Sequence, residues 1–284
     1  MNLEYKIKFV CDYIQLHLDD ELDVEKLCHI ALLSKFHFHR IFTAQTGITL
    51  IRFIQMARLK RASYQLAFEK DLRIIEIALN ASFESPESFS RAFKRHFDQT
   101  PTEFRQAPNW QYWHLQFNYD IPKIEKKMIV NVIERPSEKI AFLRHRGDPH
   151  RVLETAARFI EWRKKTGLSP VKLSKTYGIP YSDPEIIAQQ DFIFDIAGSV
   201  LNSIPENEFS VENAVLPAGR YAIVRHYGSH ESIKDSVYYI FREWLPNQDE
   251  EAGDFPIYFQ YLNFVHEVDE HELMTDIFLL LKEK

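Results

Sequence analysis

This 284-residue sequence has only two cysteines, and it lacks a secretion signal and long hydrophobic runs. The two cysteines, Cys11 and Cys28, form no paired spacing, which argues against a disulfide framework and against a cysteine zinc site. The first ten residues do not have the basic-then-apolar layout of a signal peptide. The longest apolar runs, such as residues 277–281, are far too short to span a bilayer. We therefore expect a cytoplasmic protein with no membrane partner.

Acidic residues are absent from a long stretch near the start of the chain. Residues 26–68 contain seven Lys or Arg residues, three His and no Asp or Glu. Residues 1–108 carry 15 Lys/Arg against 14 Asp/Glu, whereas residues 109–284 carry 20 against 27. A polyanion such as DNA favours a basic zone, because each Lys or Arg near a phosphate releases counterions. The alternative is a solvated basic face, and charge alone does not decide between the two.

The first 107 residues read as about seven helices that contain an internal repeat. The pattern S-x3-F-x-R-x-F occurs at residues 34–42 and again 51 residues later, at 85–93. Ser34 and Ser85 each precede an amphipathic run as an N-cap residue does, and Pro86 follows at the first helical position. Each copy is a short helix, a tight turn and a second helix. The region therefore contains two helix-turn-helix units.

The second helix of each unit has a phenylalanine-rich core face and a neighbouring face that is left for contacts. That neighbouring face carries Phe36, His39, Arg40 and Thr43 in the first unit and Glu87, Ser90, Arg91 and Lys94 in the second. Arginine can read guanine O6 and N7 in the major groove with two hydrogen bonds. Because Arg40 and Arg91 hold the same repeat position, base reading is favoured over the alternative that both are surface ion-pair residues. We expect Lys35 and Arg95 to hold phosphates.

Residues 22–105 resemble the DNA-binding domain of AraC/XylS-family transcription regulators, and the segment FESPESFSRAFKRHFDQTPTEFR carries the strongest likeness. The resemblance implies two helix-turn-helix units bridged by a long helix over residues 49–68. It also implies that Phe36, His39, Arg40, Glu87 and Arg91 lie in base-reading places. The family usually has glycine where this chain has Ser82 and Asp98. Both positions are expected to adopt a positive φ, which Asp tolerates better than Ser.

A boundary is expected at residues 108–124, between an N-terminal domain of residues 1–107 and a C-terminal domain of residues 125–284. This linker is too aromatic to be a flexible Gly/Ser chain, since it contains Trp110, Tyr112, Trp113 and Phe117. A connector docked on one domain or both is the favoured interpretation. A relay between the two domains is the alternative.

The C-terminal part is also duplicated. The pattern P-x4-A-x2-R-H-x-G occurs at residues 136–147 and again 81 residues later. Each copy reads as strand, turn, strand and then helix, and hairpin-joined strands with helices on one face predict an α+β domain. His145 and His226 end equivalent strands, where a hydrogen-bonded structural histidine is favoured over a catalytic one. The acidic runs at residues 249–251 and 267–272 are interpreted as solvated loops.

This part resembles the GyrI-like small-molecule-binding domain in LPAGRYAIVRHYGSH, in REWLP and in PIYFQYLN. The order of the two domains is similar to that of Rob-type regulators. The resemblance implies a groove between two equivalent halves that takes hydrophobic, often cationic, drug-like effectors. Relatives commonly have a glutamate where this chain has Phe259, so a neutral or mildly cationic planar effector is expected here. The candidate pocket residues are Trp162, Tyr177, Phe192, Trp244, Phe259 and Tyr261, and ordinary core packing is the alternative for each.

The sequence thus predicts a multidomain protein, with an all-α N-terminal domain of two helix-turn-helix units and an α+β C-terminal domain of duplicated antiparallel strand–helix halves. Its expected function is ligand-responsive transcription regulation, with double-stranded DNA, a small-molecule effector and RNA polymerase as partners. No HExxH, GxSxG, Walker or dinucleotide motif is present, and we expect neither an enzyme nor a cofactor or metal site. A C-terminal hydrolase using residues such as Asp191 and Asp195, or a protein-interaction module, are the alternatives.

Overall fold

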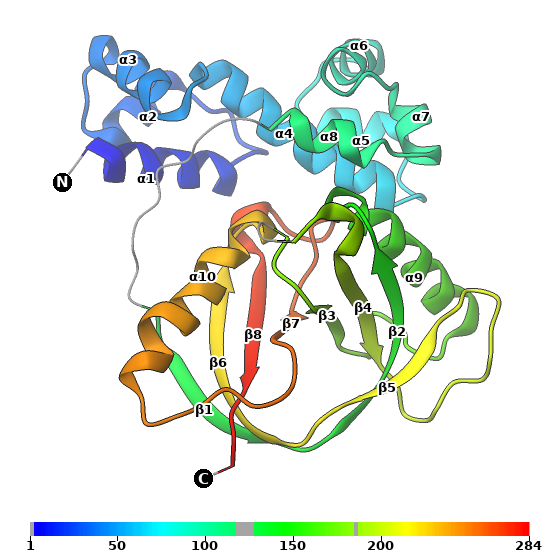
Figure 1. Ribbon diagram of the computed structural model, residues 1–284. Helices are drawn as coiled ribbons and strands as arrows, with labels where there is room; N and C mark the ends of the chain where they lie inside the picture. Colours follow the sequence, from blue (N-terminus) through cyan, green and yellow to red (C-terminus); the bar gives the residue numbers. More distant parts are fainter. Residues whose placement is uncertain (1–2, 118–127, 185–186, 284) are drawn as a thin grey trace. The chain divides into compact units, whose positions relative to one another are not determined.

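The computed structural model describes residues 3–117, 128–184 and 187–283, apart from the side chain of Phe36 (Figure 1). The chain divides into two compact units. The first comprises Met1–Lys126 together with Val265–Glu272, and the second comprises Lys127–Phe264 together with Leu273–Lys284.

The N-terminal region is helical, as the sequence predicts. Its helices are α1 (Leu3–Leu16), α2 (Val24–Ala31), α3 (Lys35–Thr46), α4 (Leu50–Phe68), α5 (Ile74–Asn80), α6 (Pro86–Phe97), α7 (Pro101–Gln106) and α8 (Trp110–Leu115). Capping side chains start several of them: Asp23 accepts from the backbone N–H of Glu25 and Ser85 from that of Ser88. Ser34 stands at the N-cap of α3 without a side-chain capping bond.

Aromatic side chains fill the interior of this first unit. Phe38 and Phe42 of α3 are fully buried and pack with Phe53 of the long helix α4. In the second helix-turn-helix unit, Phe89 and Phe93 of α6 are buried in the same way. Each repeat therefore turns its two phenylalanines inward, which leaves the opposite side of α3 and α6 to solvent.

Helix α8 lies within the predicted linker and packs in the first unit. Trp110 and Trp113 are buried, and the indole N–H of Trp113 donates to the hydroxyl of Ser63 on α4 at 2.7 Å. The aromatic part of the linker is thus attached to the helices of the first unit. Residues 118–124 of the predicted linker lie outside the described residues.

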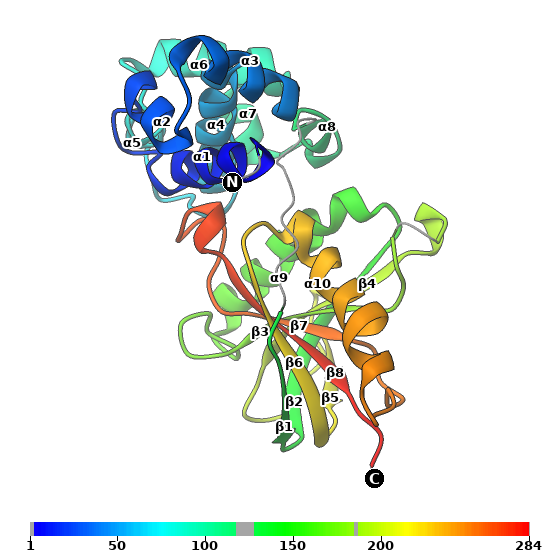
Figure 2. The same ribbon diagram turned by 90° about the vertical axis from the view of Figure 1, so that its left-hand side faces the viewer.

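The second unit is built on one eight-stranded antiparallel sheet in the order β1-β6-β8-β7-β3-β4-β2-β5. The strands are β1 (Val130–Arg135), β2 (Glu138–Arg146), β3 (Thr176–Pro180), β4 (Ile193–Ser199), β5 (Glu212–Leu216), β6 (Gly219–Tyr227), β7 (Tyr258–Tyr261) and β8 (Met274–Leu280). Helix α9 (Val152–Thr166) follows β2, and α10 (Ile233–Tyr239) follows β6 and continues as a π-helical turn over Ile240–Trp244. Figure 2 shows the strands as one curled sheet with both helices beside it.

The two halves of this sheet exchange their first strands. The predicted hairpin between consecutive strands does not form, because β1 pairs with β6 and β5 pairs with β2. Only two residues, Pro136 and Ser137, separate β1 from β2, and the chain bends there instead of reversing. The pseudo-twofold relation expected from the sequence therefore holds, but the first strand of each half pairs with a strand of the other half.

The sheet carries an apolar cluster on each face. Both helices cover the first face, where Phe159 of α9 and Ile240 join Phe259 and Ile277. The second face holds Tyr177, Tyr221, Tyr258 and Phe278, together with other buried residues.

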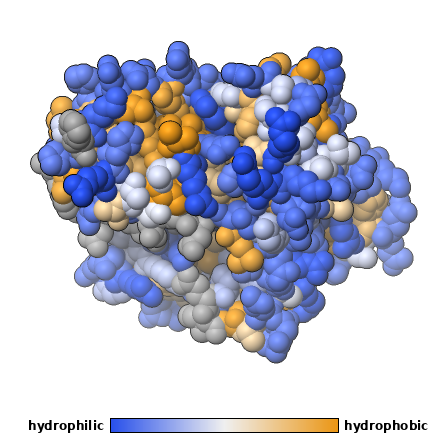
Figure 3. Space-filling model, turned by 90° about the horizontal axis from the view of Figure 1, so that it is seen from above, coloured by the Kyte–Doolittle hydropathy of each residue, from blue (hydrophilic) through white to orange (hydrophobic). Residues whose placement is uncertain are grey.

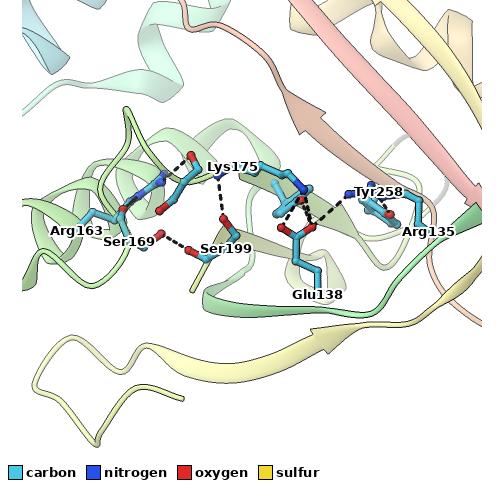
Figure 4. A network of polar contacts seen from close by, with 9 residues as sticks. Arg135, Glu138, Arg163, Ser169, Lys175, Ser199 and Tyr258 are labelled. Atoms are coloured by element: carbon cyan, nitrogen blue, oxygen red, sulfur yellow. Dashed lines mark hydrogen bonds and ion pairs between the residues drawn. The ribbon is translucent and has the colours of Figure 1, made fainter. Parts of the chain in front are cut away.

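On the second face, polar side chains gather around the carboxylate of Glu138 (Figure 4). Glu138 accepts from the hydroxyl of Tyr177 at 2.6 Å, from Lys175 at 3.0 Å and from Arg135 at 3.2 Å. Arg135 also donates to the hydroxyl of Tyr258 at 3.0 Å. This network satisfies polar groups that burial would otherwise leave costly.

Candidate DNA-binding and effector-binding sites

The turns of the two helix-turn-helix units have matching backbone conformations. Ser82 and Asp98 adopt φ values of 58° and 56°, as predicted from the glycines that the AraC/XylS family usually has at these positions. Their counterparts in the first unit, Leu32 and Gly47, have φ values of 51° and 75°. Since a positive φ is costly for residues other than glycine, the repeat preserves the turn geometry even where the sequence does not favour it.

The repeated arginines are available for contacts. Arg40 on α3 and Arg91 on α6 are exposed, and neither makes a hydrogen bond or an ion pair within the described part of the chain. This geometry argues against the alternative that they are surface ion-pair residues. Their guanidinium groups are free to bind a partner from outside.

The other predicted DNA-contacting residues lie on the same two helices. Exposed side chains are those of Lys35, His39, Thr43, Glu87, Lys94 and Arg95, whereas Ser90 is half-buried. The side chain of Phe36 lies outside the described residues. The surface in Figure 3 is mostly hydrophilic, with apolar residues in separate groups.

Some cations of the basic stretch at residues 26–68 bind carbonyls and carboxylates within the first unit. Arg58 donates to the carbonyls of Leu18 and Asp20, at 2.9 and 3.0 Å. Lys60 and Arg61 form ion pairs with carboxylates. The sequence could not separate these internal cations from the exposed ones, because their acidic partners lie far away along the chain.

Exposed cations remain around the N-terminus of α4. Burial lowers the pKa of His96, and the positive charges of Arg95 and Arg52 lower it further. Arg52 is exposed and was not singled out by the sequence as a contact residue. Both arginines thus act on His96 as positive charges, and exposed cations of this kind are suited to phosphates.

In the second unit the duplication extends to individual hydrogen bonds. Arg144 holds Asp195 through two bonds of 2.7 Å, and 81 residues later Arg225 holds Asp276 through bonds of 2.7 and 2.9 Å. Asp195 also accepts from the hydroxyl of Tyr181, and burial raises the pKa of that phenol to about 12. These are fully engaged structural pairs, which leaves Asp195 poorly placed to act as a catalytic base.

The paired histidines are structural in the same way. His145 Nδ1 lies 2.9 Å from the hydroxyl of Thr155, and its Nε2 lies 3.0 Å from the carbonyl of Asp148. His226 makes the equivalent contacts with Ser236 and with the carbonyl of Ser229. Burial lowers the pKa of His226, so it is held neutral. Both ring nitrogens are occupied in each copy, as expected for histidines that fix a strand-to-helix turn.

Five of the six predicted effector residues belong to one face of the sheet. Trp162, Phe192 and Phe259 are buried in the helix-covered cluster, and Trp244 and Tyr261 pack against it half-buried. Tyr177 is the exception, because it lies in the cluster on the opposite face and its hydroxyl is bonded to Glu138. The alternation of side chains along β3 explains the difference, and Tyr177 cannot share a pocket with the others.

The centre of the helix-covered face is closely packed around Gly178. A Cβ at this position would lie 2.5 Å from the hydroxyl of Tyr261 and 2.6 Å from Cζ of Phe194. Gly178 stands directly opposite Phe259 in the sheet, at the point where the two halves meet. Only glycine leaves room for both rings there.

Three residues near this centre were missed by the sequence reasoning. Phe194 could have been found because it alternates with Phe192. His230 lies with its ring centroid 5.0 Å from that of Tyr261. Thr275 stands opposite Tyr261 in the sheet, and its buried hydroxyl has no hydrogen-bond partner within the described residues. No sequence pattern marks an unsatisfied hydroxyl.

A hollow of about 620 Å³ lies elsewhere, in the first unit. Its lining includes Leu22, Ile51, Ile54 and Phe83, with Asp20 among its polar residues. None of the predicted effector residues contributes to it.

Comparison with known proteins assigns both regions. The family of the GyrI-like small molecule binding domain matches residues 128–282, and a helix-turn-helix domain family matches residues 27–107. The chain is 44% identical over 152 residues to the probable transcriptional regulator YgiV of Escherichia coli strain K12, which covers 54% of this chain and 95% of that protein. It is 23% identical over 282 residues to the transcriptional regulator Rob of Salmonella typhimurium, which covers 86% of this chain and 92% of that protein.

Solved structures are also similar. The cryo-EM structure of an EcmrR–DNA complex aligns with a TM-score of 0.48 at 14% identity and covers 88% of this chain and 83% of that one. The DNA-binding domain of AdpA, in complex with a target DNA, aligns with a TM-score of 0.34 at 28% identity and covers 36% and 90%.

In the described residues, no helix combines the length and apolar character needed to cross a bilayer. The matched domains and relatives indicate a regulator rather than an enzyme.

The match to the GyrI-like small molecule binding domain alone spans more than half of the residues, so the chain belongs to the GyrI-like family. It is a transcriptional regulator that joins this small-molecule-binding domain to an AraC-type helix-turn-helix DNA-binding domain.

Proposed function

We propose that Arg40 and Arg91 read bases in two successive major-groove segments, while Lys35 and Arg95 hold phosphates. The observation that carries this proposal is the repetition of an exposed, unpaired arginine at one position of both second helices. One chain then carries two recognition helices, and a monomer can bind an asymmetric site. Recognition helices on one face of DNA sit about 34–36 Å apart, one helical turn.

The test compares single variants on a selected binding site and on random DNA. Arg40→Ala and Arg91→Ala should each weaken specific binding by about 1–3 kcal/mol, with a smaller loss on random DNA. Arg73→Ala is a matched control, since Arg73 is exposed on the same unit but pairs with Glu76. Equal losses on specific and random DNA would mean that both arginines contact only phosphates.

The proposed effector is a planar, apolar molecule that is neutral or mildly cationic. Support comes from the aromatic residues gathered on the helix-covered face and from the apolar Phe259 at the meeting point of the halves. A cation in an apolar site needs a nearby negative charge or an aromatic face, and Phe259 supplies only the latter. We therefore expect affinity to depend little on the charge of the ligand.

Two adjacent substitutions separate the faces of strand β7. Phe259→Glu places a carboxylate on the helix-covered face, whereas Gln260→Glu places the same charge on the opposite one. Fluorescence titration of the full chain with cationic rhodamine 6G and neutral Nile red measures the result. Phe259→Glu should raise the preference for the cation, and Gln260→Glu should not. The same shift in both variants would place the site elsewhere.

RNA polymerase is the proposed partner of the DNA-bound regulator, as the family resemblance implies. In vitro transcription from a bound promoter should change when the full chain is added. The Arg91→Ala variant should lose this effect in proportion to its loss of specific DNA binding. An unchanged transcript level at full promoter occupancy would argue against a polymerase contact.

A further inference from the structure

Two of the acidic residues that pair with cations of α4, Asp269 and Glu270, come from a segment more than 200 residues away in the sequence. This segment, Val265–Glu272, belongs to the first unit, where it contacts α1 and forms ion pairs with α4. The prediction of a solvated loop at residues 267–272 is wrong for Asp269 and Glu270. Their side chains are only 14% and 21% exposed, because each faces a cation of α4.

Lys60 is the most deeply buried of these cations. Its residue is 4% exposed, and its ammonium nitrogen lies 2.8 Å from Oε1 of Glu270. The same nitrogen lies 5.7 Å from the ring centre of Trp113 and 5.0 Å from that of Phe117. A buried ammonium is costly without a counter-charge, so Lys60 at this place requires an acidic partner.

Arg61 makes the second link. Its Nη1 lies 3.1 Å from Oδ1 of Asp269, and the guanidinium also pairs with Asp19. Burial raises the pKa of Asp269, and the charge of Arg61 opposes that rise. Two neighbouring cations on one helix thus hold two neighbouring carboxylates on the segment.

Apolar and histidine contacts complete the packing. Val265 and Val268 line a small gap of about 20 Å³ with Leu18, Ala57 and other residues of α1 and α4. That volume holds no more than one water molecule, so the surfaces fit closely. His266 Nε2 lies 3.3 Å from Oε1 of Glu69, at the end of α4.

The two ends of this segment run directly into the proposed effector strands. Tyr261, the last residue of β7, lies four residues before Val265, and Thr275 of β8 lies three residues after Glu272. Only a few residues of backbone therefore separate β7 and β8 from the contacts that the segment makes with α4.

We propose that Lys60 and Arg61 on α4 form a docking surface for the acidic segment Val265–Glu272, and that this attachment couples the effector strands to the DNA-binding helices. The coupling rests on the proposed effector function, whereas the docking itself does not. The ligand of this basic surface is thus a part of the same chain and not a nucleic acid.

Amide hydrogen exchange of the full chain tests the docking without any ligand. Asp269→Asn with Glu270→Gln keeps the side-chain shapes and removes both charges, and Lys60→Gln removes the principal cation. Each variant should speed exchange in residues 265–272 by about tenfold or more. Combining them should add little, because either change already breaks the link. Glu251→Gln, which removes only an exposed pair with Lys282, is the control and should change nothing there.

Two results would overturn the docking. One is a segment that exchanges as fast in the wild type as in the variants. The other is a set of effects that simply multiply, because independent changes cannot reflect one contact.

Rhodamine 6G tests the coupling. When the dye binds, exchange in residues 57–64 should change in the wild type and not in the Asp269→Asn/Glu270→Gln variant. Dye binding that leaves residues 57–64 unchanged in the wild type would refute the coupling. Absence of dye binding would instead refute the proposed effector class, while the docking is decided by the first experiment alone.

Discussion

The two units of this regulator each contain a duplication, and they use it in opposite ways. In the helical unit, each helix-turn-helix copy buries its own pair of phenylalanines, and the copies differ on their outer faces, where His39 corresponds to Ser90. In the sheet unit, the halves exchange strands and repeat their internal polar contacts almost bond for bond. They differ at their meeting point, where Gly178 faces Phe259. Duplicated scaffolds here stay constant where they hold the fold and diverge where a partner is expected.

Core truncation should have the largest effect and shows whether the helical copies are equivalent. Phe38→Ala and Phe89→Ala each remove a fully buried ring, for which we expect a loss of about 3–5 kcal/mol in unfolding free energy. Chemical denaturation followed by circular dichroism measures both. Markedly unequal losses would mean that one copy supports the other.

The duplicated ion pairs in the sheet should differ because their burial differs. Arg144 and Asp195 are 32% and 2% exposed at the side chain, whereas Arg225 and Asp276 are 47% and 13% exposed. We expect Asp195→Asn to cost about 2–3 kcal/mol and Asp276→Asn about 1 kcal/mol, since solvent screens the more open pair. Thermal unfolding of the two variants measures the two losses of stability. Equal costs would show that contact geometry outweighs exposure.

Acid should destabilise the sheet unit through His226. Burial holds the pKa of His226 below its ordinary value of 6.5, so the unfolded chain takes up the proton first as pH falls. The stabilisation is therefore complete above about pH 6.5 and is lost as pH drops below it. His226→Gln should be less stable at pH 7.5 and should lose less stability between pH 7.5 and 5.5. The control is His39→Gln, which removes an exposed imidazole; if it flattens the profile equally, His226 is not the source.

Glycine in the strained turns should give the smallest effect. Leu32 and Ser82 hold the same turn position at positive φ in the two helical copies. Leu32→Gly and Ser82→Gly should each stabilise the unit by about 0.5–1 kcal/mol, because glycine adopts this conformation without the steric cost. The melting temperature reports the gain. A loss in either variant would show that its side chain contributes a compensating contact.

Short-range patterns in the sequence predict much of this structure. The repeat intervals of 51 and 81 residues, the N-cap residues and the phenylalanine spacing determine the helices and the equivalent strands, because helix caps and side-chain periodicity act locally. Exchange of β1 and β5 was not predictable, since spacing does not say which strand becomes a neighbour. The exclusion of Tyr177 from the effector face needed the position of β3, which was not assigned as a strand. The acidic partners of Lys60 and Arg61 were not predictable either, because a stretch without Asp or Glu does not indicate which distant segment supplies the carboxylates.

The exchanged first strand has a consequence for the protein during its synthesis. Val130 of β1 pairs with Val224 of β6, so roughly 90 residues must be added after β1 before its partner exists. At about 5–20 residues per second, the ribosome needs about 5–20 s to supply them. Throughout that interval the uncharged run Met-Ile-Val-Asn-Val-Ile at residues 128–133 has no strand to pair with. An unpaired apolar strand is prone to join another chain. We therefore expect the yield of native protein to depend on translation speed and on protection of these six residues by chaperones.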